Sequence, residues 1–271
     1  MSLVEEAVIL AGGKSIRFGR DKLTYRIDGK EILVRVIEAA QAVAGKVVLS
    51  VRREEDGERL SKLTGLEYRV DEPLPCTGPI RGVLSSIKRE NTLLLPADLP
   101  WMDGDALRSF LDVCESFSAQ ICGLLWSSTQ KYLDPMIALI KSTEPLVYVR
   151  RACGLKGVRV TDVHRAASSI AMVSAGMLVD PWRFLDVDRP EDLILRDEER
   201  EGWNEEILLL IPRNLGNPYR KAIEGLERGS LDQVREMFNL ELGMFRGVEN
   251  VRAHVAKDIR SLGEDDGGCD R

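Results

Sequence analysis

A short apolar run near the start of the chain ends in a pair of glycines, and this junction restricts the possible folds strongly. Residues 7–11 read Ala-Val-Ile-Leu-Ala, and Gly12 and Gly13 follow at once. Aliphatic and β-branched residues over this length predict a buried strand, and adjacent glycines predict a tight loop. Because glycine has no Cβ atom, backbone N–H groups at this loop can approach phosphate oxygens.

Basic residues in the same loop fit an anionic ligand. Arg17 and Lys22 bring positive charge close to the glycines, which suits a triphosphate. The spacing differs from a Walker A loop, because no Gly-Lys-Ser or Gly-Lys-Thr follows at the required distance, and it is not G-x-G-x-x-G. The alternative interpretation is a glycine-rich turn whose basic residues are only solvated.

Strand-like and helix-like stretches alternate after this loop. Apolar spacing predicts helices over residues 32–43, 80–87 and 105–113, and apolar runs predict strands over residues 47–51, 66–70, 92–95, 119–125 and 184–188. This alternation predicts an α/β fold with a doubly wound, mostly parallel sheet. Ligands of such sheets bind beyond the carboxyl ends of the strands. We therefore expect Gly12, Asp71 and Asp98, which each follow a predicted strand, to share one edge.

Two acidic positions are candidates for chemistry. Asp98 lies in the sequence Pro-Ala-Asp-Leu-Pro, which holds a carboxylate in an extended loop and suits the oxygen preference of Mg²⁺. The alternative is an aspartate that accepts hydrogen bonds from turn amides. Asp188 precedes Pro190 and two acidic residues, a pattern typical of a helix start. The N-cap is Asp188 or Arg189 beside it, and the residues alone favour Asp188 in this structural role.

The last part of the chain differs in composition. Residues 196–271 hold 12 of the 38 basic and 17 of the 44 acidic side chains, so most of the net charge of −6 lies there. Three helices are predicted, around Pro218, from Ser230 with Gln233 as a capping box, and over residues 248–262. We expect a domain over residues 1–201, a helical extension over residues 202–263 and a disordered tail over residues 264–271.

Composition also limits the function. The chain has no overall basic surface charge of the kind that binds nucleic acid. Its five cysteines include no C-x-x-C, so neither a disulfide framework nor a zinc site is indicated, and a reducing cytoplasm fits best. No apolar run reaches the ~20 residues that span a bilayer, and no signal peptide is evident. His164 and His254 lack a ligand spacing, and neither is a convincing general base.

The complete loop sequence carries a family resemblance. Leu-Ala-Gly-Gly-Lys-Ser-Ile-Arg-Phe-Gly-Arg-Asp-Lys resembles the signature of the nucleotidyltransferases related to molybdenum cofactor guanylyltransferase, with Phe18 in place of a methionine. Three further segments follow in the family's order as far as Leu193. They are Asp71 with the Gly-Pro-Ile-Arg-Gly sequence at Gly78, the Pro-x-Asp-x-Pro sequence around Asp98, and residues 186–193.

The resemblance implies a reaction and a set of site residues. The family transfers GMP from GTP to molybdopterin with Mg²⁺ and releases pyrophosphate. The catalytic residues it implies are Arg17, Lys22 and Asp98, and the metal ligands are Asp98 and Asp188. The nucleotide-binding residues it implies are Leu10, Ala11, Gly12, Gly13, Lys22, Asp71, Gly78 and Asp98. Gly12 favours GTP, since the related cytidylyltransferases tend to have alanine at this position.

Several residues depart from the family pattern. Asp186 and Asp188 stand where asparagines are frequent, and Asp134 stands where relatives have histidine or glutamine before proline. Arg81 replaces a small residue, and it either reaches the second substrate or points to solvent. These departures keep other acceptors open, including a cobinamide, polyol or sugar phosphate, and also a CTP-dependent transfer.

A different class of protein also stays possible at this point. It is a regulatory protein that binds a nucleotide without turnover and uses its C-terminal helices for interaction. Those helices are predicted to dock a protein partner, to join two copies of the chain, or to pack over the edge of the sheet.

Overall fold

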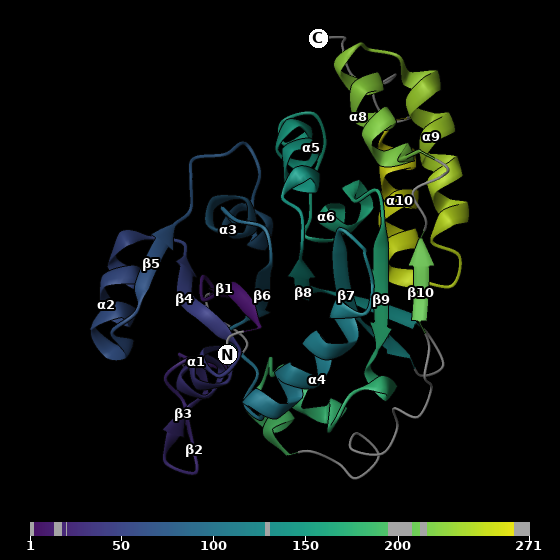
Figure 1. Cartoon of the computed structure of the whole chain (residues 1–271). Helices are drawn as coiled ribbons and strands as arrows, with labels where there is room; N and C mark the ends of the chain where they lie inside the picture. Colours follow the sequence, from purple (N-terminus) through teal and green to yellow (C-terminus); the bar gives the residue numbers. More distant parts are fainter. Residues whose placement is uncertain are drawn as a thin grey trace.

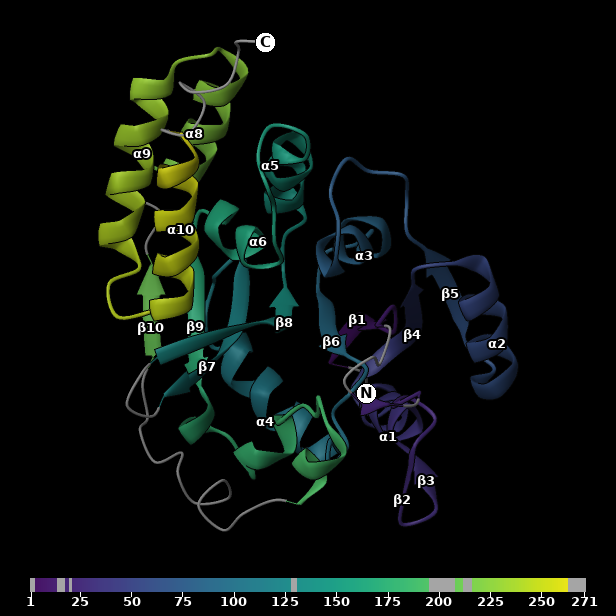
Figure 2. The same ribbon diagram turned by 180° about the vertical axis from the view of Figure 1, so that it is seen from behind.

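The structure is a computed structural model that describes residues 3–13, 18–19, 21–127, 131–194, 208–211 and 216–262. Its centre is a sheet with the strand order β10-β9-β7-β8-β6-β1-β4-β5 (Figures 1 and 2). The strands are β1 (Val4–Leu10), β4 (Ala44–Val51), β5 (Glu67–Val70), β6 (Thr92–Pro96), β7 (Ile121–Ser127), β8 (Lys131–Ile140), β9 (Ile170–Ser174) and β10 (Leu208–Ile211). A short hairpin, β2 (Arg26–Ile27) with β3 (Lys30–Glu31), stands apart.

Pairing within the sheet confirms the predicted α/β architecture. β1 pairs in parallel with both β4 and β6, β4 pairs in parallel with β5, and β7 with β9. β8 and β10 are the antiparallel strands. Because β1, β4, β5 and β6 point the same way, their carboxyl ends meet at one edge of the sheet.

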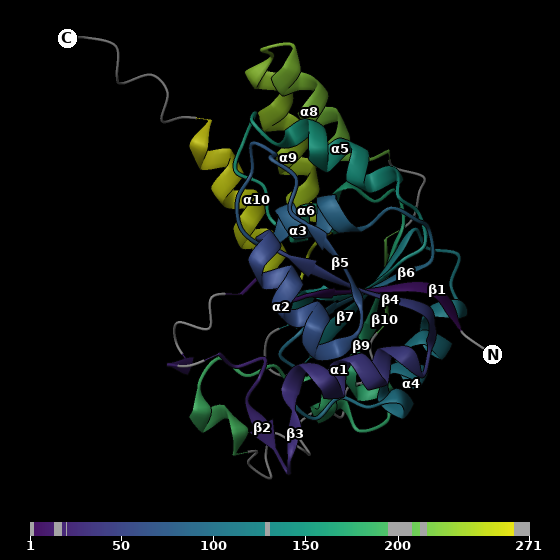
Figure 3. The same cartoon turned by 90° about the vertical axis from the view of Figure 1, so that its left-hand side faces the viewer.

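Helices cover both faces of the sheet, as an edge-on view shows (Figure 3). α1 (Ile32–Gln41) and α4 (Gly104–Glu115) lie on one face, and α3 (Pro79–Ser86), α5 (Glu144–Ala152) and α6 (Thr161–Ala166) lie on the other. α2 (Glu54–Thr64) packs beside β4 and β5. Ile9 belongs to the core of the first face and Val8 to that of the second, as the alternation of side chains along a strand requires.

Three further helices pack on the second face. They are α8 (Pro218–Glu227), α9 (Leu231–Met244) and α10 (Glu249–Ser261), and the predicted helices there are confirmed. The predicted capping box is wrong, because the Ser230 side chain makes no cap hydrogen bond. The predicted disordered segment, residues 264–271, lies outside the described residues. In the described part of the chain, no helix is both long and apolar enough to cross a bilayer.

A buried ionic network joins these C-terminal helices to α6. The Arg165 guanidinium donates to Glu241 of α9 at 2.6 Å and to Asp258 of α10 at 2.7 Å. It also lies 4.8 Å from the ring centroid of Tyr219 in α8. Arg165 and Glu241 are each only about 1% exposed as side chains. The charges are therefore compensated within the protein and not by water.

Residues 184–188 do not form the predicted strand. A 3-10 helix, η3 (Pro181–Phe184), precedes an extended stretch whose Val187 N–H donates to the carbonyl of Asp98 at 3.2 Å. A single hydrogen bond of this kind does not pair two segments as strands. The helix predicted next is a single 3-10 turn, η4 (Pro190–Leu193). Its N-cap is Arg189, the alternative that the sequence offered, and the preference for Asp188 is wrong. The Asp192 carboxylate instead accepts the N–H groups of Asp188 and Arg189.

Candidate active site

A cavity of about 340 Å³ lies at the carboxyl ends of β1, β4, β5 and β6. Six residues that the loop signature and later motifs single out line it together with Leu10: Gly12, Gly13, Lys22, Asp71, Gly78 and Asp98. The expectation that strand ends would bring Gly12, Asp71 and Asp98 to one edge is thus confirmed. Ala11 lies behind the cavity, where its buried N–H donates to the carbonyl of Ser50 at 2.8 Å. Arg17 lies outside the described residues.

Glycine leaves room for a ligand in this cavity. A Cβ atom on Gly12 would lie 3.5 Å from the backbone nitrogen of Arg52, an ordinary contact, and one on Gly13 would meet nothing within 4 Å. Protein packing therefore does not demand glycine at either position. Gly78 differs, because its φ of +79° favours glycine at the start of α3. Gly78, Pro79 and Arg81 line the cavity, so the N-terminus of α3, with the positive end of the helix dipole, borders it.

Asp71 is held in a close-packed corner of the cavity. Its N–H donates to the carbonyl of Val51 at 3.0 Å. A Cβ atom on Gly82 would lie 3.3 Å from the Asp71 carboxylate and 2.8 Å from the Ser50 hydroxyl. Burial raises the pKa of Asp71, and the positive charges of Arg81 and Arg52 oppose this shift.

Arg81 takes a role that the sequence did not suggest. Its Nε donates to the carbonyl of Cys76 at 2.9 Å, and its Nη2 donates to the carbonyl of Leu74 at 3.1 Å. The guanidinium therefore fastens the loop between β5 and α3 to the start of α3. Thr77 and Gly78 in this loop line the cavity, so Arg81 fixes part of its wall.

Lys22 connects three distant segments. Its ammonium donates to the carboxylate of Asp98 and, at 3.1 Å, to the carbonyl of Val187, and it lies 4.0 Å from an Asp188 oxygen. The side chains of Lys22 and Asp98 are 12% and 16% exposed, whereas that of Asp188 is 50% exposed. Asp188 does not line the cavity, but its carboxylate lies near the ammonium of Lys22, which does.

Acidic side chains gather around this lysine. Burial raises the pKa of Asp186, and the negative charges of Asp98 and Asp188 raise it further. Burial likewise raises the pKa of Asp134 to about 6, and the charges of Asp186 and Asp98 contribute. The mutual repulsion of these carboxylates favours an added cation.

The donor set fits Mg²⁺ shared with a substrate. Among the described residues, no three acidic, histidine or cysteine side chains are grouped so that they would hold a metal by themselves. Mg²⁺ commonly takes only one or two protein carboxylates and completes its shell with phosphate oxygens and water. Asp98 and Asp188, both beside Lys22, match this requirement.

Sequence reasoning missed several lining residues. Arg52 follows the end of β4 in the same way that Asp71 follows β5, so the rule of strand ends could have identified it. Met136 carried no such signal, because it lies inside β8 and not at a strand end, in the stretch between Asp134 and Ala138 where the pairing with β7 shifts register. His164 and His254 do not line the cavity. His254 instead pairs with the Thr161 hydroxyl at 2.8 Å.

Known proteins share this architecture. The family model for the MobA-like NTP transferase domain matches residues 7–170. A probable molybdenum cofactor guanylyltransferase of Pyrococcus horikoshii is 28% identical over 196 residues, which are 69% of this chain and 96% of that protein. A probable molybdenum cofactor guanylyltransferase of Aquifex aeolicus is 35% identical over 121 residues, 45% of this chain and 58% of that protein.

A solved structure agrees in fold. The crystal structure of molybdopterin-guanine dinucleotide biosynthesis protein A from Archaeoglobus fulgidus matches with a TM-score of 0.56 at 17% identity. The match covers 72% of this chain and 97% of that protein, and at this identity it supports the fold alone. Together with the family model, which spans more than half of the sequence, it leads to one conclusion. The chain belongs to the MobA-like NTP transferase family.

Proposed function

We propose that this protein transfers GMP from GTP to a phosphorylated acceptor, molybdopterin, with Mg²⁺ and with release of pyrophosphate. The observation that carries the proposal is the pairing of Lys22 with Asp98 beside a cavity lined by Gly12 and Gly13. The relatives named as molybdenum cofactor guanylyltransferases support the same reaction.

The nucleotide phosphates are assigned to the glycine loop. Backbone N–H groups near Gly12 and Gly13 offer donors to phosphate oxygens, and the N-terminus of α3 adds the positive end of its dipole. Lys22, which lines the same cavity, offers a positive charge, and the family signature assigns Arg17 to the same phosphates. Asp71 and Gly78 are assigned to the nucleotide along the wall that Arg81 fixes.

The reaction requires alignment and charge neutralisation more than proton transfer. A phosphate oxygen of the acceptor attacks the α-phosphorus of GTP, a new P–O bond forms, and the bond to the β-phosphate oxygen breaks. Pyrophosphate leaves with the bonding electrons. Because the attacking oxygen is already an anion, no general base is needed, in keeping with the position of both histidines away from the cavity.

Asp98 and Asp188 would hold Mg²⁺. The ion supplies positive charge to the phosphate oxygens when it is bound. Lys22 keeps the two carboxylates together and neutralises part of their charge.

The direct test measures pyrophosphate release with each of the four nucleoside triphosphates, with Mg²⁺ and purified molybdopterin. We expect release with GTP and formation of the guanine dinucleotide. Release that is fastest with CTP, or none with any nucleotide, would contradict the assignment. The Gly12→Ala protein should fold normally, since packing tolerates a Cβ there, and should prefer GTP less strongly.

The metal assignment has a separate test. Asp98→Asn and Asp188→Asn should each raise the Mg²⁺ concentration needed for half-maximal rate, with the larger effect for the more buried Asp98. Asp112→Asn, on the exposed side of α4, is the matched control. Equal Mg²⁺ dependence in all three variants would remove Asp98 and Asp188 from the metal site.

A second candidate is the same transfer to a different phosphorylated acceptor, such as a cobinamide, polyol or sugar phosphate. The observation that keeps it open is the departure of Asp134, Asp186 and Asp188 from the residues that are frequent in the family at these positions. The same assay with these phosphates in place of molybdopterin separates the two. Binding of nucleotide without turnover is disfavoured by the retained Lys22 and Asp98.

A further inference from the structure

Strand β8 is interrupted in the middle. Its last residues, Ala138 to Ile140, pair with β7 on one side and β6 on the other. Its first residues, 131–134, pair with β7 only. A register shift separates the two halves, since Gly123 of β7 is opposite Ala138 while the next residue, Leu124, is opposite Asp134. Among the described strands, the first half of β8 therefore has a strand neighbour on one edge alone.

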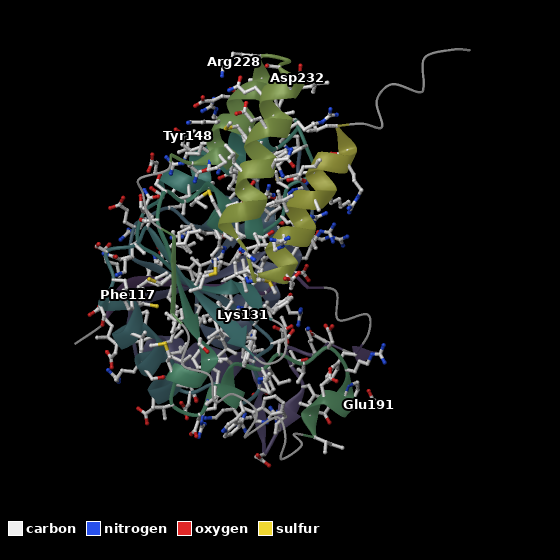
Figure 4. All side chains as sticks on the ribbon, turned by 90° about the vertical axis from the view of Figure 1, so that its right-hand side faces the viewer. Phe117, Lys131, Tyr148, Glu191, Arg228 and Asp232 are labelled. Atoms are coloured by element: carbon white, nitrogen blue, oxygen red, sulfur yellow. The ribbon has the colours of Figure 1, made fainter. Side chains whose placement is uncertain are left out.

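The start of α10 covers the other edge. The side-chain amide of Asn250 accepts the Leu133 N–H at 3.1 Å and donates to the Leu133 carbonyl at 2.8 Å. Lys131 forms an isolated parallel bridge with Val248, just before α10. Lys131 lies close to the beginning of this helix in Figure 4. Asn250 thus replaces a neighbouring strand for the backbone of Leu133.

These hydrogen bonds are costly to lose. Leu133 is fully buried, so its N–H and carbonyl depend on Asn250 for their hydrogen bonds and not on water. Buried backbone groups without a partner destabilise a structure, and the local chain moves to satisfy them. The segment that would move is the one between Lys131 and the register shift.

That segment lies across β6 and Asp98 from the glycine loop and Asp71, because the strand order runs β8-β6-β1-β4-β5. With the nucleotide assigned to the β1 and β5 side, the β8 side is the one left for the acceptor. Asp134, the next residue, lies close enough to Asp98 and Asp186 for their charges to raise its pKa. Met136, two residues later, lines the cavity beside Asp98. Residues 134–136 thus connect the Asn250 contact directly to the acidic cluster.

We propose that Asn250 is a positioning residue for the acceptor, acting through Leu133 on Asp134 and Met136. The inference rests on the proposed transfer reaction and extends it to a helix beyond the family match, which ends at residue 170. The residues assigned to the nucleotide follow β1 and β5 or begin α3, across β6 from this segment, so the acceptor is expected to depend on Asn250 more than GTP does.

The test compares Asn250→Ala with Arg252→Ala. Arg252 lies on the same helix and donates to the Leu242 carbonyl of α9 at 3.2 Å, so its loss loosens α10 without touching β8. Asn250→Asp is a nearly isosteric second variant that keeps the acceptor for the Leu133 N–H and loses the donor. The KM values for GTP and molybdopterin are measured, together with hydrogen exchange of the amides of residues 131–136.

In both Asn250 variants we expect a KM for molybdopterin raised about tenfold, and a KM for GTP changed by less than about twofold. Exchange at residues 131–136 should accelerate in these variants and not in Arg252→Ala. Faster exchange with an unchanged acceptor KM would overturn the positioning role, as would an equal rise in both KM values. If the unaltered protein makes no guanine dinucleotide, the proposed function fails, and the acceptor role fails with it. Unchanged hydrogen exchange at residues 131–136 in the Asn250 variants is a separate failure, because it would overturn the structural contact itself.

Discussion

The ammonium of Lys22 donates a hydrogen bond to the carboxylate of Asp98, 76 positions later in the chain. They meet because Lys22 lies in the loop after β1, Asp98 lies just after β6, and these two strands are parallel neighbours in the sheet. A positive charge and a candidate metal ligand therefore lie side by side at the edge of one cavity.

Lys22→Ala should lower kcat for pyrophosphate release by at least about a hundredfold. The substitution removes a positive charge that stabilises the negative charge developing on the phosphate oxygens in the transition state. The variant should retain its fold, since Lys22 lies at the border of the cavity and not in the hydrophobic core. Lys62→Ala, on the exposed side of α2, is the control. Turnover of Lys22→Ala at the rate of the unaltered protein would refute the catalytic assignment.

Gly82→Ala should weaken nucleotide binding. The new methyl group would lie 2.8 Å from the Ser50 hydroxyl and 3.3 Å from Asp71, so it would push the Asp71 carboxylate out of place. We expect a KM for GTP raised by roughly tenfold. Gly243→Ala in α9 has nothing within 4 Å and should stabilise the fold by about 1 kcal/mol without changing KM. An unchanged KM in Gly82→Ala would argue against Asp71 as a nucleotide contact.

Arg165→Met should destabilise the protein by about 3–5 kcal/mol, because it leaves the carboxylates of Glu241 and Asp258 buried without this partner. Urea unfolding measures the change. Adding Glu241→Leu to the same chain removes one orphaned charge and should recover part of the loss. The exposed Arg228→Met is the control and should change stability by less than about 0.5 kcal/mol. A small effect of Arg165→Met would mean that the network does not hold the C-terminal helices.

The stability of the fold should depend on pH through His164. Burial lowers the pKa of this histidine to about 4, from a value near 6.5 in the unfolded chain. Between these values the unfolded chain binds a proton that the folded protein does not. The contribution is therefore fully present above pH 6.5 and is lost as the pH falls towards 4, by about 3 kcal/mol in total.

His164→Leu removes this titration, so its free energy of unfolding should fall less steeply from pH 6.5 to pH 4. Urea unfolding at a series of pH values gives the comparison. The difference in slope is informative even if the leucine packs poorly beside Gly123, because a packing defect shifts the curve at every pH alike. Parallel curves for the two proteins would contradict the prediction.

The sequence predicted the elements whose own apolar side chains follow a clear helical or strand periodicity. β1 and β6 are short apolar runs with a clear end, so their positions, and with them the meeting of Gly12 with Asp98, followed from periodicity and the parallel-sheet rule. α2 was not predicted, because it lies at the edge of the sheet and buries only Gly57 and Leu60. Such a helix has no apolar stripe to recognise.

Other features depend on contacts that no local pattern records. Residues 184–188 alternate like a strand, but Phe184 and Val187 bury their side chains in two different clusters without a ladder. The hydrogen bonds of Arg81 to its own loop, and of Asn250 to Leu133, arise only when the chain has folded. In the sequence, Asp134, Asp186 and Asp188 are separate departures from the family pattern, and only the fold brings Asp188 near the Lys22 ammonium.

The hydrogen bond from the Val187 N–H to the Asp98 carbonyl has a mechanical consequence. It fastens the segment that carries Asp188 to the backbone of the residue proposed as the other metal ligand. Together with the Lys22 ammonium, which donates to the Val187 carbonyl, it holds the two carboxylates near each other before any ion or substrate binds, so the protein itself bears the electrostatic cost of bringing them together.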